Sequence, residues 1–264
     1  MGTDSLLVVM SDIHSNLIAL NRALDFMKVQ GIENRKKMVC LGDVIGYGPK
    51  PQECVNIAKT FGVCLSGNHE SYLPGEFDSR RVNPKAIEVI DFTRGILNKE
   101  DLDWLNGLPS SKTITIPKTN KTLTFTHYAP GVPDGYVESK DDTLTAFGAI
   151  PENVSITFTG HTHKPAMAAV DLKGRPHYYP AEDLKKHFGW DKPIMLEPDQ
   201  RYIINVGSIG QPRDGDERLA FVAYDMAEHS VRWFRTDYDI EKTVAQMEEV
   251  NLPESLRERL FQGL

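Results

Sequence analysis

The chain has 264 residues, of which 40% are hydrophobic, 25% charged and 9% aromatic, as in an ordinary folded protein. This length suits one large domain or two small ones and permits a substantial core without disulfides. The formal net charge of −7 excludes a global positive field of the kind that holds nucleic acid or an anionic membrane, so an anionic substrate has to be attracted locally.

Cysteine usage and hydropathy indicate the compartment. Cys40, Cys54 and Cys64 are odd in number and unevenly spaced, which argues against a disulfide framework and favours a reducing environment. No apolar run approaches the roughly 20 residues that cross a bilayer. The N-terminus also lacks the basic and hydrophobic regions of a signal peptide. We therefore expect a cytoplasmic protein.

The first quarter of the chain alternates short apolar strands with helices. Strands are predicted at 6–10, 38–41 and 62–65, helices at 17–29 and about 53–59, and a Gly- and Pro-rich turn at 42–51. This β-α-β-α-β order predicts a parallel sheet.

The rest of the chain is less regular. We expect two helices within 83–107, a hairpin of strands 112–117 and 121–126, a helix at 140–148 and a strand at 154–159. Residues 164–235 are mostly strands and turns, which suggests a second sheet, with 173–200 as an excursion between strands. Closing helices are predicted at 239–250 and 253–261. The favoured architecture is one domain over 1–264, with two facing sheets and helices outside.

Side chains able to bind metal follow the predicted strands. They are Asp12 and His14 after the first, Asp43 after the second, Asn68 and His69 after the third, His127 after the hairpin, and His161 and His163 after strand 154–159. Ligands collect at the carboxyl ends of strands in α/β sheets. Five of the eight histidines lie in these groups, whereas His177, His187 and His229 do not. Mixed nitrogen and oxygen ligands suit Zn, Mn, Fe or Co better than Mg or Ca.

Each group also has an ordinary structural explanation. Asp12-x-His14 could be a turn or a helix cap, the Asn68 segment an Asx turn, and His127 a buried histidine with its hydrogen bonds satisfied. Gly160-His161-Thr162-His163 is the most specific single group. Five such groups in this order, all after strands, are hard to obtain by chance.

Together these motifs resemble those of the calcineurin-like metallophosphoesterase superfamily. The resemblance spans residues from about 6 to 236, and segment 205–215 is similar to that of small bacterial and archaeal phosphodiesterase-like members. Such members have been linked to phosphodiester, phosphomonoester or dinucleoside polyphosphate cleavage. The resemblance implies an α/β fold, a four-layer α/β/β/α sandwich of two facing mixed sheets, and a dinuclear metal-dependent phosphoesterase.

By motif position, the resemblance implies two metals and one further catalytic side chain. One metal takes Asp12, His14 and His163, the other takes Asn68, His127 and His161, and Asp43 bridges both, while His69 stands near the leaving group. Mn, Fe, Zn, Ni or Co would serve, with Mn favoured for activity. Such a pair activates a bridging hydroxide as nucleophile. Two divalent cations less two carboxylates and one hydroxide leave about +1, a local positive site for phosphate.

Gly46-Tyr47 departs from the related protein phosphatases. Those enzymes carry Asp-Arg here, so protein phosphatase activity is not expected, and the group that orients His69 stays open. Glu70 is adjacent to that histidine but could point away. Tyr47 itself either lines the cleft or simply packs.

Two further positions are candidate substrate contacts. Tyr128 stands where many small members have Gly, and it narrows the cleft, stacks on a base or packs. Arg213 contacts phosphate or pairs with Asp214 or Asp216.

A small phosphate ester is the expected substrate, with diesters or nucleotides favoured. An inactive binding module on the same fold is one alternative, although no ligand is missing. A nuclease is another, disfavoured by the acidic balance and by the lack of a basic patch with interleaved aromatics. We expect no stable nucleic-acid binding and no membrane partner, and the oligomeric state stays open.

Overall fold

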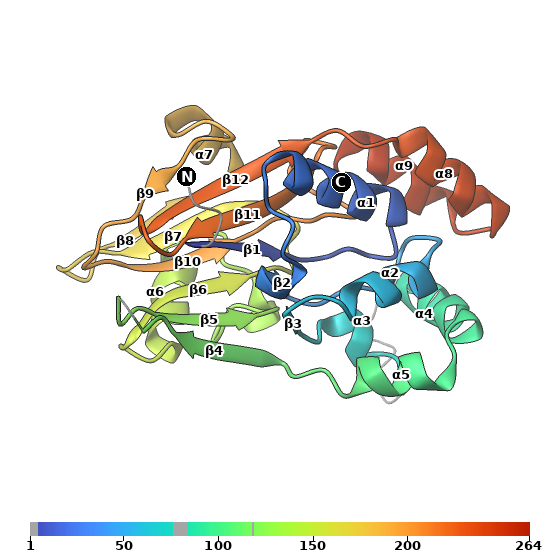
Figure 1. Ribbon diagram of the computed structural model, residues 1–264, viewed down its shortest axis with the longest axis horizontal. Helices are drawn as coiled ribbons and strands as arrows, with labels where there is room; N and C mark the ends of the chain where they lie inside the picture. Colours follow the sequence, from blue (N-terminus) through green and yellow to red (C-terminus); the bar gives the residue numbers. More distant parts are fainter. Residues whose placement is uncertain (1–4, 76–83, 118) are drawn as a thin grey trace.

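The computed structural model describes residues 5–75, 84–117 and 119–264. Asn83, at the start of the predicted helical segment 83–107, lies outside these residues. The described chain forms two six-stranded sheets that face each other, with helices on the outer faces (Figure 1).

The first sheet joins the two ends of the chain. Its strand order is β3 (Val63–Cys64), β2 (Met38–Cys40), β1 (Leu6–Met10), β11 (Leu219–Asp225), β12 (Ser230–Thr236) and β9 (Ile194–Met195). Strands β1, β2 and β3 are parallel, as predicted, and α1 (Leu17–Val29) and α2 (Pro51–Ala58) connect them. Strand β11 runs antiparallel to β1, with Val8 opposite Ala223. The sheet is therefore mixed.

The second sheet uses the middle of the chain. Its order is β4 (Ser111–Thr115), β5 (Thr122–Thr126), β6 (Val154–Thr159), β10 (Arg201–Asn205), β7 (Ala166–Val170) and β8 (Pro176–Tyr179). Strands β5, β6 and β10 are parallel, and the other pairs are antiparallel. The prediction that 164–235 belongs to a second sheet is wrong for β9, β11 and β12. Because every residue of β11 is buried, this strand needs neighbours on both sides, and β1 and β12 provide them.

Strand β1 illustrates the layers. Leu7 and Val9 point into the core between the sheets, whereas Val8 and Met10 point into the core under the helices. That outer core contains residues of α1, α2, α4 (Pro84–Ile96), α5 (Lys99–Asn106), α8 (Ile240–Glu249) and α9 (Glu254–Gln262). On the far side, α6 (Lys140–Ala149) packs on β7 and β8. The four-layer α/β/β/α sandwich is confirmed.

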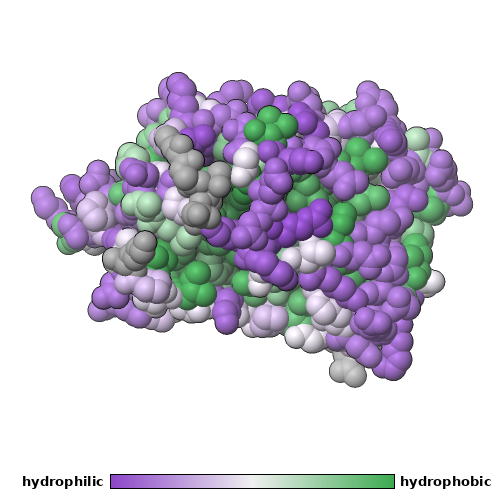
Figure 2. Space-filling model, in the orientation of Figure 1, coloured by the Kyte–Doolittle hydropathy of each residue, from purple (hydrophilic) through white to green (hydrophobic). Residues whose placement is uncertain are grey.

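Segment 173–200 is more regular than an excursion. It contains β8, then α7 (Ala181–His187), then β9, so it supplies an edge strand to each sheet. No helix of the described residues is long and apolar enough to cross a membrane. The face shown in Figure 2 is mostly hydrophilic, with small separate apolar patches.

Candidate active site

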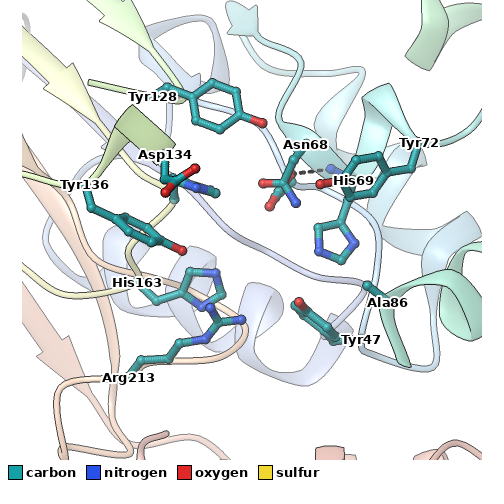
Figure 3. Close-up of a pocket in the computed structure, with 12 residues that line it drawn as sticks. Tyr47, Asn68, His69, Tyr72, Ala86, Tyr128, Asp134, Tyr136, His163 and Arg213 are labelled. Carbon is teal, nitrogen blue, oxygen red and sulfur yellow. Dashed lines mark hydrogen bonds between the residues drawn. The ribbon is translucent and has the colours of Figure 1, made fainter. Parts of the chain in front are cut away.

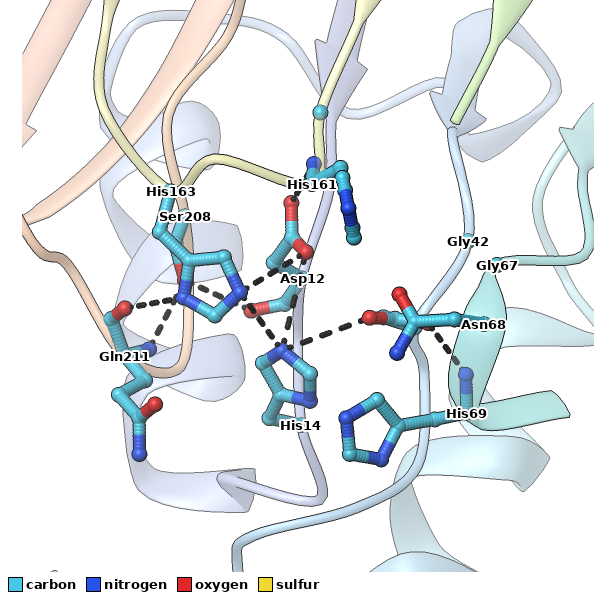
Figure 4. Close-up of polar contacts among 12 residues, drawn as sticks. Asp12, His14, Gly42, Gly67, Asn68, His69, His161, His163, Ser208 and Gln211 are labelled. Carbon is cyan, nitrogen blue, oxygen red and sulfur yellow. Dashed lines mark hydrogen bonds and ion pairs between the residues drawn. The ribbon is translucent and has the colours of Figure 1, made fainter. Parts of the chain in front are cut away.

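The predicted metal ligands come from both sheets and meet at one end of the sandwich. Asp12 and His14 follow β1, and Asp43 follows β2, while His163 follows β6 of the other sheet. One ligand atom from each of these four buried residues lies within 4.8 Å of the other three (Figure 4). The structure thus joins groups that are up to 151 positions apart in the sequence, the span from 12 to 163.

Lone pairs converge at the centre of this group. The Nδ1 atom of His14 lies 3.1 Å from the carbonyl oxygen of Ile45, and Nδ1 of His163 lies 2.5 Å from that of Gln211, so in each ring Nδ1 carries the proton. The two Nε2 atoms, 3.0 Å apart, are then left as acceptors. Asp12 adds Oδ1, 3.1 Å from Nε2 of His163. Acceptors packed this closely repel one another unless a cation lies between them, so the donor set fits a divalent metal.

A second group of predicted ligands lies beside the first. Nε2 of His127 lies 3.2 Å from Oδ1 of Asn68 and 3.4 Å from Oδ2 of Asp43. The ring of His161 stands 5.1 Å from that of His127. Asp43 also lies 3.7 Å from Nε2 of His14, so its carboxylate touches both groups. This is the placement that the bridging assignment requires, and all seven predicted ligands are brought together.

The ligand loops have strained backbones. Twelve non-glycine residues of the described chain have a positive φ, and five of them are predicted ligands. They are Asp12 (56°), His14 (50°), Asp43 (53°), His161 (69°) and His163 (62°). Left-handed backbone costs roughly 1–2 kcal/mol for such a residue, and conformations of this kind cluster at functional sites.

Burial and mutual charge set the protonation of these groups. Burial opposes ionisation of Asp43, but the neighbouring His127 outweighs it and holds the carboxyl pKa well below its usual range. Burial would lower the pKa of His127, yet the Asp43 carboxylate raises it to about 9. Burial lowers the pKa of His161 to about 4 and that of His163 to about 3. Those two rings are therefore neutral at pH 7, as metal binding requires.

His69 occupies a different environment. Its ring is 1% exposed, and Nδ1 has no hydrogen-bond partner among the described residues. A Cβ on Gly46, which has a φ of +95°, would lie only 2.1 Å from that nitrogen. The ring is instead held by Tyr47, with centroids 4.6 Å apart, and by His14 at 4.8 Å. At the position where the protein phosphatases carry an acid, the backbone of Gly46 therefore packs directly against the ring of His69.

Glu70 does point away from His69. Its buried carboxylate accepts hydrogen bonds from the backbone of Gly67, Asp43 and the two residues after it. Burial and the Asp43 charge raise the pKa of Glu70 to about 7, against those hydrogen bonds, which lower it. Glu70 thus binds the backbone of residues 43–45 and 67 and does not orient the His69 ring.

A cavity of about 410 Å³ opens above the ligands. Figure 3 shows aromatic rings around it, and the lining residues that no sequence motif predicted are Tyr72, Ala86, Asp134 and Tyr136. Tyr136 stacks on the ring of His161, with centroids 4.7 Å apart and planes 17° apart. Tyr128 is 38% exposed and meets the same imidazole edge-on at 4.6 Å, so it both packs and narrows the cavity.

Arg213 lies on the cavity wall and forms no ion pair with the neighbouring acids. Its Nε and Nη2 atoms donate to Oε1 of Gln211, and its guanidinium lies 5.5 Å from the ring centre of Tyr47. Asp214 pairs with Arg235, and Asp216 pairs with Arg218, so the salt-bridge alternative is wrong. The guanidinium can therefore receive an anion in the cavity.

Comparison with known proteins gives the same picture. A calcineurin-like phosphoesterase superfamily domain matches residues 6–229. The uncharacterized protein MJ0912 of Methanocaldococcus jannaschii is 34% identical over 265 residues, covering 98% of each chain. A metallophosphoesterase from Sphaerobacter thermophilus is 30% identical with a TM-score of 0.77, covering 98% of this chain and 99% of that one. PH1004 from Pyrococcus horikoshii OT3, 20% identical over 98% of each chain, shares the fold with a TM-score of 0.72. The chain therefore belongs to the calcineurin-like phosphoesterase superfamily.

Proposed function

We propose that this chain is a metal-dependent phosphoesterase that hydrolyses a small phosphate ester, with phosphodiesters and nucleotides as favoured substrates. The observation that carries the proposal is the convergence of four buried acceptors, from Asp12, His14, Asp43 and His163, at the floor of a polar cavity. Nothing else at this place would hold such acceptors together as well as a divalent cation.

Seven residues would hold two ions. Asp12, His14 and His163 form one set, Asn68, His127 and His161 form the other, and Asp43 stands between them. When bound, the ions supply Lewis acidity and an activated water as nucleophile. They also add positive charge, which offsets the two carboxylates and draws an anionic substrate to a chain of net charge −7.

Residues of the cavity would bind and orient the substrate. Arg213 is placed to donate to phosphate oxygens, while Tyr47 and Tyr128 stand on opposite walls and limit its size (Figure 3). His69 would stand near the leaving group. Burial lowers its pKa to about 3, so the ring is neutral at pH 7, and an anionic phosphate beside it would raise that pKa.

A metal-by-substrate activity matrix tests the proposal. Mn²⁺, Zn²⁺, Co²⁺, Ni²⁺ and Fe²⁺ would each be combined with p-nitrophenyl phosphate, bis-p-nitrophenyl phosphate, cyclic nucleotides and dinucleoside polyphosphates. We expect hydrolysis with Mn²⁺ and its loss on chelation. Inactivity with every metal would contradict the proposal.

The His69→Ala variant separates chemistry from metal binding. Nδ1 of this side chain has no hydrogen-bond partner among the described residues, and His69 is not a proposed ligand, so metal content should stay unchanged. The turnover number should fall by roughly 10²–10⁴-fold, the range for a general acid or base.

Activity of the wild-type chain on single- or double-stranded DNA in a gel assay would instead point to a nuclease.

A further inference from the structure

Glu70 is a buried carboxylate surrounded by backbone donors. Oε2 accepts from the N–H groups of Asp43 and Gly67, both at 2.8 Å, and Oε1 accepts from Val44 at 2.9 Å and Ile45 at 3.3 Å. The residue is 1% exposed. Each of these N–H groups would cost about 1–3 kcal/mol if left buried without an acceptor. One side chain thus accepts the hydrogen bonds of buried backbone donors from two loops.

The opposite edge of segment 42–45 is bonded to the first ligand loop. The carbonyl oxygens of Gly42, Asp43 and Val44 accept from the backbone of Asp12, His14 and Ser15 at 3.1, 2.9 and 2.8 Å. Segment 42–45 therefore lies as a strip between the first ligand loop on one edge and Glu70 on the other.

The second carboxylate completes a reciprocal arrangement. Oδ1 of Asp43 accepts the backbone N–H of His69 at 2.9 Å, while Glu70 accepts the backbone N–H of Asp43. The two loops also approach too closely for side chains, since a Cβ on Gly67 would lie 2.1 Å from Oδ1 of Asp43. Among the described residues, the hydrogen bonds between segments 42–45 and 67–70 are the ones made by these two carboxylates.

We propose that Glu70 is a positioning residue that fixes Asn68 relative to Asp43, and so sets the metal affinity of the Asn68 half of the site. The inference rests on the proposed function only in taking Asp43 and Asn68 as ligands. Asn68 opens the short helix α3 (Asn68–Ser71), whose start at Gly67 is held by Glu70. If the Glu70 carboxylate is lost, the Gly67 N–H loses its acceptor, and the bond from the His69 N–H to Asp43 is the one that still joins the strip 42–45 to this helix.

The other half of the site shares the strip 42–45 but has further bonds that Glu70 does not make. His14 is held through Ile45 and His163 through Gln211, each by its Nδ1 atom, and Oδ2 of Asp12 accepts from the backbone of His161. The strip 42–45 also keeps its bonds to the first loop without Glu70. The two halves should therefore respond unequally to the same substitution, which a purely structural role would not produce.

Manganese binding to the full chain tests the inference. In Glu70→Gln, one oxygen becomes an amide that cannot accept, so two of the four donors lose their partner. Mn²⁺ titration, followed by the EPR signal of free Mn²⁺ and by calorimetry, should give two steps in the wild type. Asn68→Ala identifies the step that belongs to its half. Glu70→Gln should weaken that step by roughly 10–100-fold, as loss of an outer-shell partner does, and the other step by less than about 3-fold.

Asp225→Asn is the matched control. Asp225 is also a buried carboxylate that accepts two backbone N–H groups, those of Ala227 and Glu228, but it lies at the end of β11, where the turn to β12 begins. Neither manganese step should change in it. Equal weakening of both steps in Glu70→Gln, or no change in either, would overturn the inference. If Glu70→Gln does not fold, Glu70→Asp keeps the charge with a shorter reach, and the same unequal weakening is expected.

Failure of this inference is distinguishable from failure of the proposed function. Two manganese steps that respond to Glu70→Gln as expected, in a wild-type chain that hydrolyses nothing, would leave the inference standing alone. Hydrolysis with manganese steps unaltered in Glu70→Gln would do the reverse. A wild type that binds fewer than two ions would overturn the inference together with the ligand assignment.

Discussion

The floor of the cavity, formed by the seven proposed metal ligands, and its wall, which includes Tyr128, Asp134 and Arg213, are built differently. On the floor, the ligand side chains are mostly buried, and their loops are joined by backbone hydrogen bonds and carboxylates. On the wall, Tyr128 is 38% exposed and Asp134 is exposed, and each comes from the turn that follows β5. Arg213 also lies on the wall and belongs to the segment between β10 and β11. We therefore expect the floor to be fixed before a substrate arrives and the wall to select among substrates.

If this contrast holds, substitutions on the floor should affect turnover and metal content, while substitutions on the wall should affect substrate affinity and choice. The effects should also decrease from floor to wall, because buried charges interact more strongly than exposed ones.

Asp43→Asn should have the largest effect. It removes the charge that both ligand groups share, while the amide oxygen can still accept from the backbone of His69. We expect kcat/KM to fall by at least roughly 10³-fold and metal content to drop by one ion or more, measured by hydrolysis and elemental analysis. Full metal content with activity within tenfold would break the assignment of this residue to the floor.

Gly46→Ala should come next. A methyl group 2.1 Å from Nδ1 of His69 has to displace the ring, so we expect a fall of roughly 10–100-fold in kcat with unchanged metal content. Gly174→Ala is the control, because its φ of +74° carries a similar backbone penalty while its Cβ meets nothing within 4 Å. If both variants lose stability but Gly46→Ala keeps full turnover, the ring is not held by this contact.

Arg213→Ala tests the wall. Loss of a charge-assisted bond to phosphate, about 1.5–3 kcal/mol, should raise KM by roughly tenfold or more and leave kcat within about 3-fold. Arg218→Ala removes an arginine from the same segment that is already paired with Asp216, and it should leave KM unchanged. If Arg213→Ala instead lowers kcat and leaves KM unchanged, the guanidinium acts with the floor residues.

Tyr128→Ala should have the smallest effect on rate and should alter selectivity. Removing the ring opens the wall beside His161, so the ratio of kcat/KM for bis-p-nitrophenyl phosphate to that for p-nitrophenyl phosphate should change by roughly 3–10-fold. Tyr128→Phe keeps the ring and should leave this ratio near the wild-type value. An equal shift in both variants would assign the effect to the hydroxyl group.

The floor was predictable and the wall largely was not. Each proposed ligand lies in a short motif directly after a predicted strand, and the strand pattern places the end of that strand at the sheet edge without knowledge of the partners. Tyr72, Asp134 and Tyr136 have no such marker, because their place depends on how turns pack across the cavity. Glu70 lay within a motif, but the direction of its side chain depends on the Gly42–Ile45 strip.

The fold shows the same division. The α/β class and the parallel β1–β3 unit follow from local patterns, since neighbouring elements pair in order. The membership of β11 in the first sheet does not follow from a local pattern, because the sequence of residues 219–225 does not indicate that β1 is the strand it pairs with.

The place of β1 between β2 and β11 has a consequence for the order of assembly. During synthesis, the strand that precedes Asp12 and His14 emerges well before its antiparallel neighbour, which follows more than 200 residues later, at Leu219–Asp225. Pairing over such a separation is slow, because the intervening chain has to close a long loop. At the usual rate of roughly 5–20 residues per second, about ten seconds or more pass between the two strands. Strand β1 therefore acquires its neighbour β2 long before its neighbour β11.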